Sequence, residues 1–535
     1  MNLDTTIKTI LSRWDNGLCP GGQLLVQMGE ETVYEACFGY ANLEQRQPVT
    51  PDSIFHIASI SKQFTVLAIL LLEREGKLSL EDDIRCYVRD LISFKEPVTI
   101  RQLCCNVSGI RDQWELLFLR GIKINDSIDM RDVNTSIRLQ KTLNFPPQEG
   151  YLYSNTGFHL LAVIVERLSG MTFPEFAKAR IFEPLGMDRT FVRESYSQVI
   201  PNLALSYQDE GTGKYFYNPL NYSLYGPTAV NTCAGDLIKI LKEYENPRVF
   251  DRKLLQRLFT PTVLKDGTVI EYCAGIMTHS FHGMTVYEHG GADAAYRGHM
   301  LWIPERKLKL ILLGNTTTYL ASKAARDIAV AVLGLEPEWT TAAAKAAPET
   351  AGAAGAVSAA KAAPGISPNA LPPVPGVYVT SMPEDPLVLE ILQKDDSFYM
   401  KREYDNAPLM AQEDGSFRVG CLDEYLVFGE HRLEYRLPNR SVSLDASRPA
   451  SAFDFGPSDG RFYQDETDCR LEITKKDGYL SVSHLRYGTT PLYVTGQCQW
   501  IFSFNPDFTM YLSACPQGLE LNGYRARHMI LKMEQ

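Results

Sequence analysis

The sequence predicts an α+β fold: an antiparallel sheet flanked by helices, followed by two small antiparallel β-barrels. Within the first 339 residues, strand patterns lie near both ends and helical patterns lie between them. From residue 375 onward, short strands alternate with turn residues and hardly any helical period occurs. An Ala/Pro/Gly-rich stretch without aromatic residues, 340–376, separates the two parts and is typical of a linker.

Composition excludes several classes of protein. With 45% hydrophobic residues among 535, the chain is globular and too long for one ordinary core. A net charge of −11 without Lys/Arg-rich runs argues against a nucleic-acid partner, and no apolar run is long enough for a membrane span. The start lacks a signal-peptide pattern, and eleven cysteines without CxxC spacing indicate reduced thiols. We therefore expect a cytoplasmic protein.

The larger part alternates element types along the chain. Residues 1–17 predict an amphipathic helix, and 21–42 predict a hairpin of two strands. Helices follow at 55–80 and at 154–182, the second interrupted at Gly170. Residues 298–315 predict two strands around a Pro-Glu-Arg turn, and 321–335 a final helix. The sheet should therefore take strands and outer helices from both ends of this part.

The strand-rich part carries a weak internal repeat. Leu389-Glu-Ile391 matches Leu471-Glu-Ile473, and a Pro-Leu pair follows each at a similar offset. This repeat predicts two related barrels in tandem. We place the domains at 1–339, 375–455 and 456–535, with the linker at 340–374.

Ser59 and Lys62 lie three residues apart at a predicted helix start. This spacing puts both on one face, so that the amine of Lys62 can reach the hydroxyl of Ser59. A lysine with a lowered pKa can activate a serine, and a helix N-terminus favours developing negative charge. The spacing alone is weak, because Ser358 and Lys361 repeat it in the linker. The alternative is that Ser59 or Ser61 is only an N-cap.

A phenol that shuttles the proton, with an amide two residues later, would strengthen this assignment. Three sequences fit: Tyr40-Ala-Asn42, Tyr153-Ser-Asn155 and Tyr244-Glu-Asn246. Only Tyr153 follows Ser59 and also lies in an irregular segment directly before a helix, where functional residues tend to lie.

A glycine-rich strand with a cation or hydrogen-bond donor would complete the site. Lys265-Asp-Gly267 is better explained as a hairpin turn. In His289-Gly290-Gly291-Ala292 the two glycines leave the backbone open to a ligand. We therefore add His289 to the catalytic candidates, and Gly290, Gly291 and Ala292 to the substrate-binding ones.

Taken in order, Ser59-Ile-Ser-Lys62, Tyr153-Ser-Asn155 and His289-Gly-Gly291 resemble the serine β-lactamase and penicillin-binding-protein superfamily. Segments such as TPDSIFHIASISKQF and IFEPLGM are similar to its class C-like branch. The resemblance covers about residues 1–335 and is closest to the D-aminopeptidases, which have an HxG motif and two C-terminal barrels. The loops Asn106-Val-Ser-Gly109 and Gln148-Glu-Gly150 depart from the usual pattern.

This resemblance implies a β-lactamase-like domain that adds an all-helical lobe to the sheet. It also implies that Ser59 attacks a carbonyl while Lys62 and Tyr153 transfer protons, with the base left open between them. Asn155 would bind the substrate amide, and the N–H groups of Ser59 and Ala292 would hold the oxyanion. Neither a metal nor another cofactor is implied.

The histidine at 289 stands where lactam hydrolases have a lysine. A mostly neutral imidazole anchors a substrate carboxylate poorly at pH 7, so aminopeptidase, amidase or esterase activity is favoured. Glu288 or Asp293 would suit a free α-ammonium, although surface solvation is the expected role of both.

The expected function is thus a serine hydrolase of D-aminopeptidase type, acting on small peptides, amino-acid amides or esters. The alternatives are a carboxylesterase, a weak β-lactamase or DD-peptidase, and a catalytically silent penicillin-binding-like module. By resemblance, a loop of the last barrel at 484–492 would cap the site. We expect neither a nucleic-acid nor a membrane partner, and a homodimer as the assembly.

Overall fold

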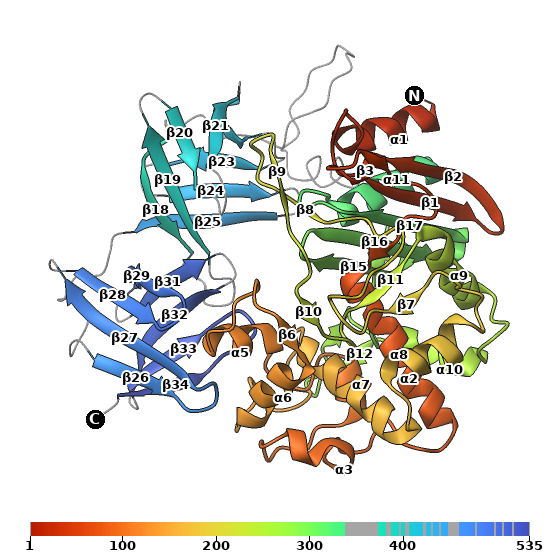
Figure 1. The fold of residues 1–535 in the computed structure, drawn as a ribbon, viewed down its shortest axis with the longest axis horizontal. Helices are drawn as coiled ribbons and strands as arrows, with labels where there is room; N and C mark the ends of the chain where they lie inside the picture. The colour runs from red at the N-terminus through yellow and green to blue at the C-terminus, as the bar shows by residue number, and fades with distance from the viewer. Residues whose placement is uncertain are drawn as a thin grey trace.

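The computed structural model of the protein describes residues 2–336 as one continuous stretch (Figure 1). Further along the chain it describes 373–380, 387–394, 397–401, 406–412, 414–420, 424–429, 432–437, 440–447, 460–476, 479–496, 499–505, 508–515 and 518–533. Nearly all of the predicted linker at 340–374 therefore lies outside the described residues. The predicted domain boundaries stay a prediction.

A six-stranded antiparallel sheet forms the centre of the N-terminal region. Its strands are, in spatial order, β14 (Met277–Phe281), β15 (Met284–Asp293), β16 (Tyr296–Ile303), β17 (Leu308–Gly314), β1 (Gly22–Met28) and β2 (Glu31–Phe38). The N-terminal hairpin joins the sheet where β1 pairs with β17. Strands from both ends of the region therefore lie side by side, as predicted (Figure 1).

Alternating residues of the strands separate two cores. On β17, Leu310 and Leu312 pack with α1 (Leu3–Leu11) and α11 (Ala321–Leu333). Ile311 and Leu313 face the opposite way, toward the core that contains α2 (Lys62–Arg74) and α9 (Ala234–Glu245). This period of two is the pattern of a sheet buried on both faces. The outer helices come from both termini, which confirms the prediction.

A helical lobe surrounds α2 and α7 (Asn155–Ser169). Its members are α3 (Arg85–Val88), α4 (Ile100–Cys104), α5 (Gln113–Leu119), α6 (Met130–Leu139), α8 (Phe173–Ala177) and α10 (Arg252–Gln256). The short helical turns are η1 (Ser12–Trp14), η2 (Ala58–Ser61), η3 (Arg89–Leu91), η4 (Lys178–Phe182), η5 (Arg257–Phe259) and η6 (Pro304–Arg306). Helix α7 ends at Gly170, which adopts the left-handed conformation as a C-cap, as the sequence predicts.

Short strands complete the N-terminal region. They are β3 (Tyr40–Asn42), β4 (Gln47–Pro48), β5 (Phe55–His56), β6 (Ile128–Asp129), β7 (Phe191–Val192), β8 (Tyr207–Asp209), β9 (Tyr215–Tyr217), β10 (Tyr222–Ser223), β11 (Val230–Thr232), β12 (Thr262–Val263) and β13 (Val269–Ile270). Strand β5 leads directly into η2 and pairs with β11. This pairing fixes the entry of the chain into α2.

The C-terminal region begins with a closed antiparallel barrel. Its strands are β18 (Gly376–Val379), β19 (Val388–Lys394), β20 (Ser397–Met400), β21 (Ala407–Ala411), β22 (Phe417–Val419), β23 (Tyr425–Phe428), β24 (Arg432–Leu437) and β25 (Arg440–Ser447). Strand β18 pairs with both β19 and β25, which closes the barrel.

Nine antiparallel strands follow and nearly close into a second barrel. They are β26 (Gly460–Gln464), β27 (Cys469–Lys476), β28 (Tyr479–His484), β29 (Gly488–Pro491), β30 (Tyr493–Gly496), β31 (Gln499–Asn505), β32 (Phe508–Cys515), β33 (Gly518–Asn522) and β34 (Met529–Met533). The Leu-Glu-Ile repeat falls on β19 and β27, the second strand of each barrel. Among the described residues, no helix is long and apolar enough to cross a membrane.

Candidate functional site

Ser59 lies in η2, the turn that leads into α2. It is partly exposed within a buried stretch. Ala58 before it has a φ of 48°, a conformation that non-glycine residues rarely adopt and that recurs at active sites. Ser61 is the N-cap residue of α2 but makes no side-chain cap hydrogen bond, because its Oγ accepts from the N–H of Val230 at 3.1 Å. The N-cap alternative therefore holds for Ser61 by position and not for Ser59.

Lys62 is fully buried, and its amine donates hydrogen bonds to three acceptors. Its Nζ donates to Ser59 Oγ at 3.1 Å, to Asn155 Oδ1 at 2.8 Å and to Pro227 O at 3.0 Å. Burial lowers the pKa of Lys62 to about 7; Asp112 and Asp293 oppose this shift, and Arg525 adds to it. Near neutral pH the amine therefore exists in both protonation states.

Tyr153 lies beside this amine. Lys62 Nζ is 4.7 Å from the centre of the Tyr153 ring. Burial raises the pKa of the Tyr153 phenol, and the hydrogen bond with Ser59 opposes this shift. At neutral pH the phenol is therefore protonated, while it remains next to the Ser59 hydroxyl.

Asn155 connects Lys62 to a buried carboxylate. Its backbone N–H and its Nδ2 donate to Asp112 Oδ2 at 2.6 and 2.9 Å, while its Oδ1 accepts from Lys62. Asp112 is also the N-cap of α5. The predicted contact of Asn155 with a substrate amide stays a prediction, because this structure shows the carboxamide bound to protein groups at both ends.

His289 is buried on β15 as a neutral imidazole. Its Nδ1–H donates to Gly290 O at 2.6 Å, so that Nε2 accepts from the hydroxyl of Tyr272 at 3.2 Å. Burial, helped by the charge of Lys62, lowers the pKa of His289 to about 3. The ring of His289 lies 6.4 Å from that of Tyr153, measured between centroids. Position 289 therefore carries no positive charge at neutral pH.

The two glycines after His289 are required by close packing. A Cβ at Gly291 would lie 2.3 Å from the carbonyl oxygen of Ile57, and one at Gly290 would lie 3.3 Å from Ser322 Oγ. Gly291 therefore lets β15 approach the segment that carries Ser59. Glu288 is the last residue of β15 that pairs with β14. Beyond it, one edge of residues 289–293 faces η2 instead of a strand. Ala292 is exposed on this stretch.

The expected surface roles of Glu288 and Asp293 are wrong. Glu288 is buried; it is hydrogen-bonded to His299 Nε2 at 3.0 Å and forms an ion pair with Arg326. Although burial acts to raise it, the contacts with His299 and Arg326 hold the pKa of Glu288 below its ordinary value. Asp293 accepts from Thr228 Oγ1 at 2.7 Å and pairs with His56 at 2.9 Å. Both carboxylates thus support the end of β15.

The competing motifs lie outside this cluster. Tyr244 is buried in the core and donates to Gln63 Oε1 at 2.6 Å. Tyr40 begins β3, and Lys265 and Gly267 lie in the β12–β13 hairpin. Among the described residues, no group of His, Cys, Asp or Glu side chains could hold a metal ion.

The second barrel reaches the site through the loop between β33 and β34, residues 523–528. Arg525 Nη1 lies 3.2 Å from Asp112 Oδ2, and its backbone N–H donates to Glu115 Oε1 at 3.1 Å. The expected capping loop at 484–492 packs elsewhere: His484 bonds the carbonyl of Leu119, and Arg486 pairs with Asp126. That prediction is corrected.

Sequence reasoning missed Asp112, Tyr272 and Arg525. Asp112 had a local signal, since an Asp before a helical pattern is a common N-cap, but this signal does not indicate a link to Lys62. Tyr272 and Arg525 had none, because only the fold brings them to the site.

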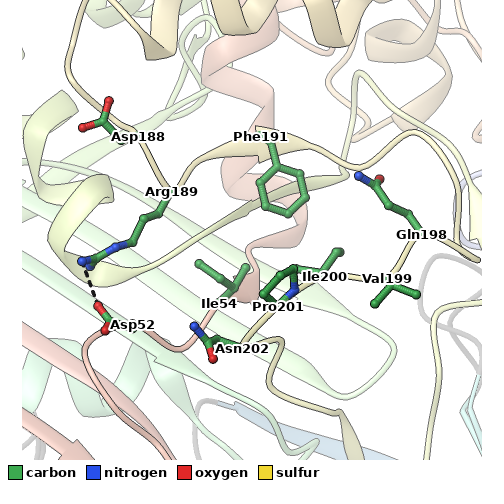
Figure 2. A pocket seen from close by; sticks show the side chains of 10 residues that line it. All are labelled: Asp52, Ile54, Asp188, Arg189, Phe191, Gln198, Val199, Ile200, Pro201 and Asn202. Carbon is green, nitrogen blue, oxygen red and sulfur yellow. Dashed lines mark ion pairs between the residues drawn. The ribbon is translucent and has the colours of Figure 1, made fainter.

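A surface hollow of about 470 Å³ lies elsewhere (Figure 2). Ile54 and Pro201 lie at its centre, and Arg189 pairs with Asp52 at 2.8 Å across one side. No candidate catalytic residue lines it. It is therefore separate from the site described above.

Sequence comparisons identify relatives of the N-terminal region. Residues 7–335 match the family described as Beta-lactamase. A D-aminopeptidase of Gluconobacter oxydans (strain 621H) is 30% identical over 328 residues, which is 60% of this chain and 61% of that protein. Penicillin-binding protein 4* of Bacillus subtilis (strain 168) is 31% identical over 308 residues, or 55% of this chain and 68% of that protein. The matched part thus spans less than two thirds of the D-aminopeptidase.

Solved structures show the same fold. An octameric penicillin-binding protein homologue from Pyrococcus abyssi has a TM-score of 0.57 at 23% identity, covering 91% of this chain and 98% of that one. D-amino acid amidase from Ochrobactrum anthropi SV3 has a TM-score of 0.52 at 23% identity, covering 62% of this chain and 99% of that one. The first likeness extends into the C-terminal region.

Proposed function

The chain belongs to the β-lactamase family, and from this premise we propose that it is a serine hydrolase of D-aminopeptidase type. It releases N-terminal residues from small peptides, amino-acid amides or esters through an acyl-enzyme on Ser59. The observation that carries the proposal is the hydrogen bond between a buried Lys62 amine and the partly exposed Ser59 hydroxyl. This is the arrangement of a nucleophile with its activating base.

Lys62 is the proposed base. An amine with a pKa of about 7 has a large neutral fraction at physiological pH and can accept the Ser59 proton. The Tyr153 phenol, whose pKa burial raises, is protonated under the same conditions and can only pass a proton on. Tyr153 lies beside both Ser59 and Lys62 and therefore serves to pass a proton on to the leaving group.

Oxyanion stabilisation is assigned to two backbone N–H groups. The first N–H groups of a helical turn have no partner within the helix, which leaves that of Ser59 for a substrate oxygen. Ala292 lies on the stretch of β15 that approaches η2, as the sequence predicts for the second donor. Gly291 makes this approach possible.

The Glu115 carboxyl, which Arg525 contacts through Oε1 only, supports specificity for an α-ammonium. Glu115 Oε2 is buried and has no hydrogen-bond partner among the described residues. Burial raises the pKa of the Glu115 carboxyl, with Arg525 opposing. A substrate ammonium would replace the lost solvation, whereas the neutral His289 offers no cation to a substrate carboxylate. This combination favours an aminopeptidase over a carboxypeptidase.

A chromogenic panel tests the proposal. D-Ala p-nitroanilide, p-nitrophenyl butyrate and nitrocefin are compared on the wild type, on Ser59→Ala and on Ser61→Ala as the matched control. We expect the D-aminoacyl substrate to have the highest kcat/KM, and Ser59→Ala alone to lose about 10⁴-fold or more. Turnover of butyrate without turnover of the anilide would favour a carboxylesterase, and fast nitrocefin hydrolysis a β-lactamase.

Two further points remain proposals. A fluorophosphonate adduct on Ser59, absent from Ser59→Ala, would exclude the silent penicillin-binding-like module. A homodimer is proposed as the assembly, and light scattering at several concentrations tests it. The Pyrococcus abyssi homologue is octameric, so the mass distinguishes a dimer from a larger ring.

A further inference from the structure

The loop at 523–528 is held to the N-terminal region through its backbone. The N–H of Asp112 and Asn144 Nδ2 both donate to the carbonyl of Arg525 at 3.1 Å. A second fixed point is the fully buried Arg111, whose Nε and Nη2 donate to the carbonyl of Arg527 at 3.2 and 3.1 Å. These contacts hold the loop backbone at Arg525 and at Arg527, and the Arg525 side chain reaches Asp112 from there.

Arg525 supplies the cation for a buried carboxylate. Asp112 is completely buried, and its Oδ2 lies 3.2 Å from Arg525 Nη1. The same oxygen accepts both hydrogen bonds from Asn155. A buried carboxylate without a cation would be costly and would tend to turn away or take up a proton. Arg525 thus supplies the counter-charge of Asp112 and holds its carboxylate beside Asn155.

The contacts continue to the nucleophile. Asn155 Oδ1 accepts from Lys62 Nζ, and Lys62 Nζ donates to Ser59 Oγ. The charged and titratable groups that act on Lys62 come from four segments: Asp112 at the start of α5, Tyr153 before α7, Asp293 and His289 on β15, and Arg525 of the second barrel. Arg525 lowers the pKa of Lys62, whereas Asp112 raises it. The position and the charge of Arg525 therefore both bear on Lys62.

We propose that Arg525 is a positioning residue of the hydrolase: it fixes Asp112, which fixes Asn155, which holds Lys62 against Ser59. The inference rests on the proposed function, because it assigns Ser59 and Lys62 the roles given there. It makes the second barrel part of the catalytic apparatus, although no hydrogen bond joins the Ser59 hydroxyl to a barrel residue among those that the structure describes. Arg525 would act on Ser59 only through the other three side chains.

The test measures the rate of Ser59 modification by a fluorophosphonate between pH 5.5 and 9, which requires no knowledge of the substrate. Arg525→Gln should slow labelling about tenfold, since a small misplacement of a catalytic group is costly. It should also move the midpoint of the pH profile upward by roughly half a unit to one unit, because a cation near Lys62 is lost. Arg527→Gln removes a charge from the same loop and should leave both unchanged.

Arg525→Lys keeps the charge but not the forked geometry. We expect its pH midpoint to equal that of the wild type and its labelling to be about threefold slower. The proposal is overturned if Arg525→Gln labels like the wild type, or if Arg527→Gln is equally impaired. It also falls if Arg525→Gln does not fold while Arg525→Lys labels at the wild-type rate. Absence of a Ser59 adduct in the wild type would instead overturn the proposed function.

Discussion

The two barrels share an architecture and a sequence repeat, but they meet the N-terminal region differently. The second barrel includes Phe118 of α5 in its own apolar core. Two of its charged side chains pair with fully buried residues of the N-terminal region: Glu466 with Arg111 at 2.9 Å, and Arg525 with Asp112. In Figure 1 this barrel lies beside α5 and β6. Its folding is therefore linked to the helix that begins at Asp112.

The first barrel makes contacts of another kind. The backbone of Gly420 approaches the carbonyl of Gly211 beyond β8, and Arg418 lines a hollow together with Asp209. Its Val379 is buried with Tyr511 of the second barrel. None of these residues is a candidate catalytic group. Among the described barrel residues, only those of the second barrel contact the buried charge network, so the two barrels hold different roles.

Removal of one core phenylalanine from each barrel would separate these roles. Phe502→Ala and Phe428→Ala should each cost about 3–5 kcal/mol of stability in their own barrel, because both side chains are buried. Only Phe502→Ala should also slow fluorophosphonate labelling of Ser59. Differential scanning calorimetry and labelling measure the two effects, and equal labelling in both variants would contradict the assigned difference.

The buried Arg111–Glu466 ion pair should contribute most of the stability with which the second barrel docks on the N-terminal region. Glu466→Gln leaves the fully buried Arg111 without its anion and should destabilise the protein by about 3 kcal/mol in urea unfolding. Glu390→Gln is the matched control in the first barrel, where the Lys401–Glu390 pair at 2.6 Å is exposed. That change should stay within about 0.5 kcal/mol. Similar losses of stability in the two variants would mean that the buried Arg111–Glu466 pair contributes no more than the exposed Lys401–Glu390 pair.

The pH profile distinguishes the two candidate bases. If neutral Lys62 accepts the proton, kcat/KM should rise through pH 7 and fall about tenfold per unit below it, since the ammonium cannot accept. Arg432→Gln, a change on the surface of the first barrel, should leave this profile unaltered. A rate that decreases through pH 7 would instead identify the ammonium form as active and Tyr153 as the base.

Substitution of Glu115 should have the smallest effect on activity among these changes, and the effect that depends most on the substrate. Glu115→Gln should raise KM for D-Ala p-nitroanilide about threefold to tenfold, because the ammonium loses a charged acceptor. Hydrolysis of p-nitrophenyl butyrate, which has no ammonium, should change little. Steady-state kinetics on both substrates measure the contrast, and parallel losses would point to a disturbance of Asp112 rather than to recognition.

Much of the site could be predicted because its motifs are local. Ser59 and Lys62 share one helical turn, so their spacing alone brings amine and hydroxyl together. The glycine pair after His289 was expected to leave the backbone open to a ligand, whereas in the structure Gly291 lets the backbone approach Ile57. The contact between Arg525 and Glu115 joins positions 410 residues apart and leaves no periodicity to detect. The wrong choice of capping loop has the same cause.

By itself the sequence predicted that strands and outer helices from both ends of the N-terminal region share one sheet, that Ser59 is the candidate nucleophile, and that position 289 carries a neutral group. These depend on alternation, helical spacing and residue type, which are properties of neighbouring positions. Tertiary structure alone decided how fully each carboxylate is paired: Glu288 is neutralised inside the fold, whereas Glu115 contacts Arg525 and keeps one unpartnered oxygen. The free energy of a buried charge depends on every group around it, and only the folded chain brings those groups together.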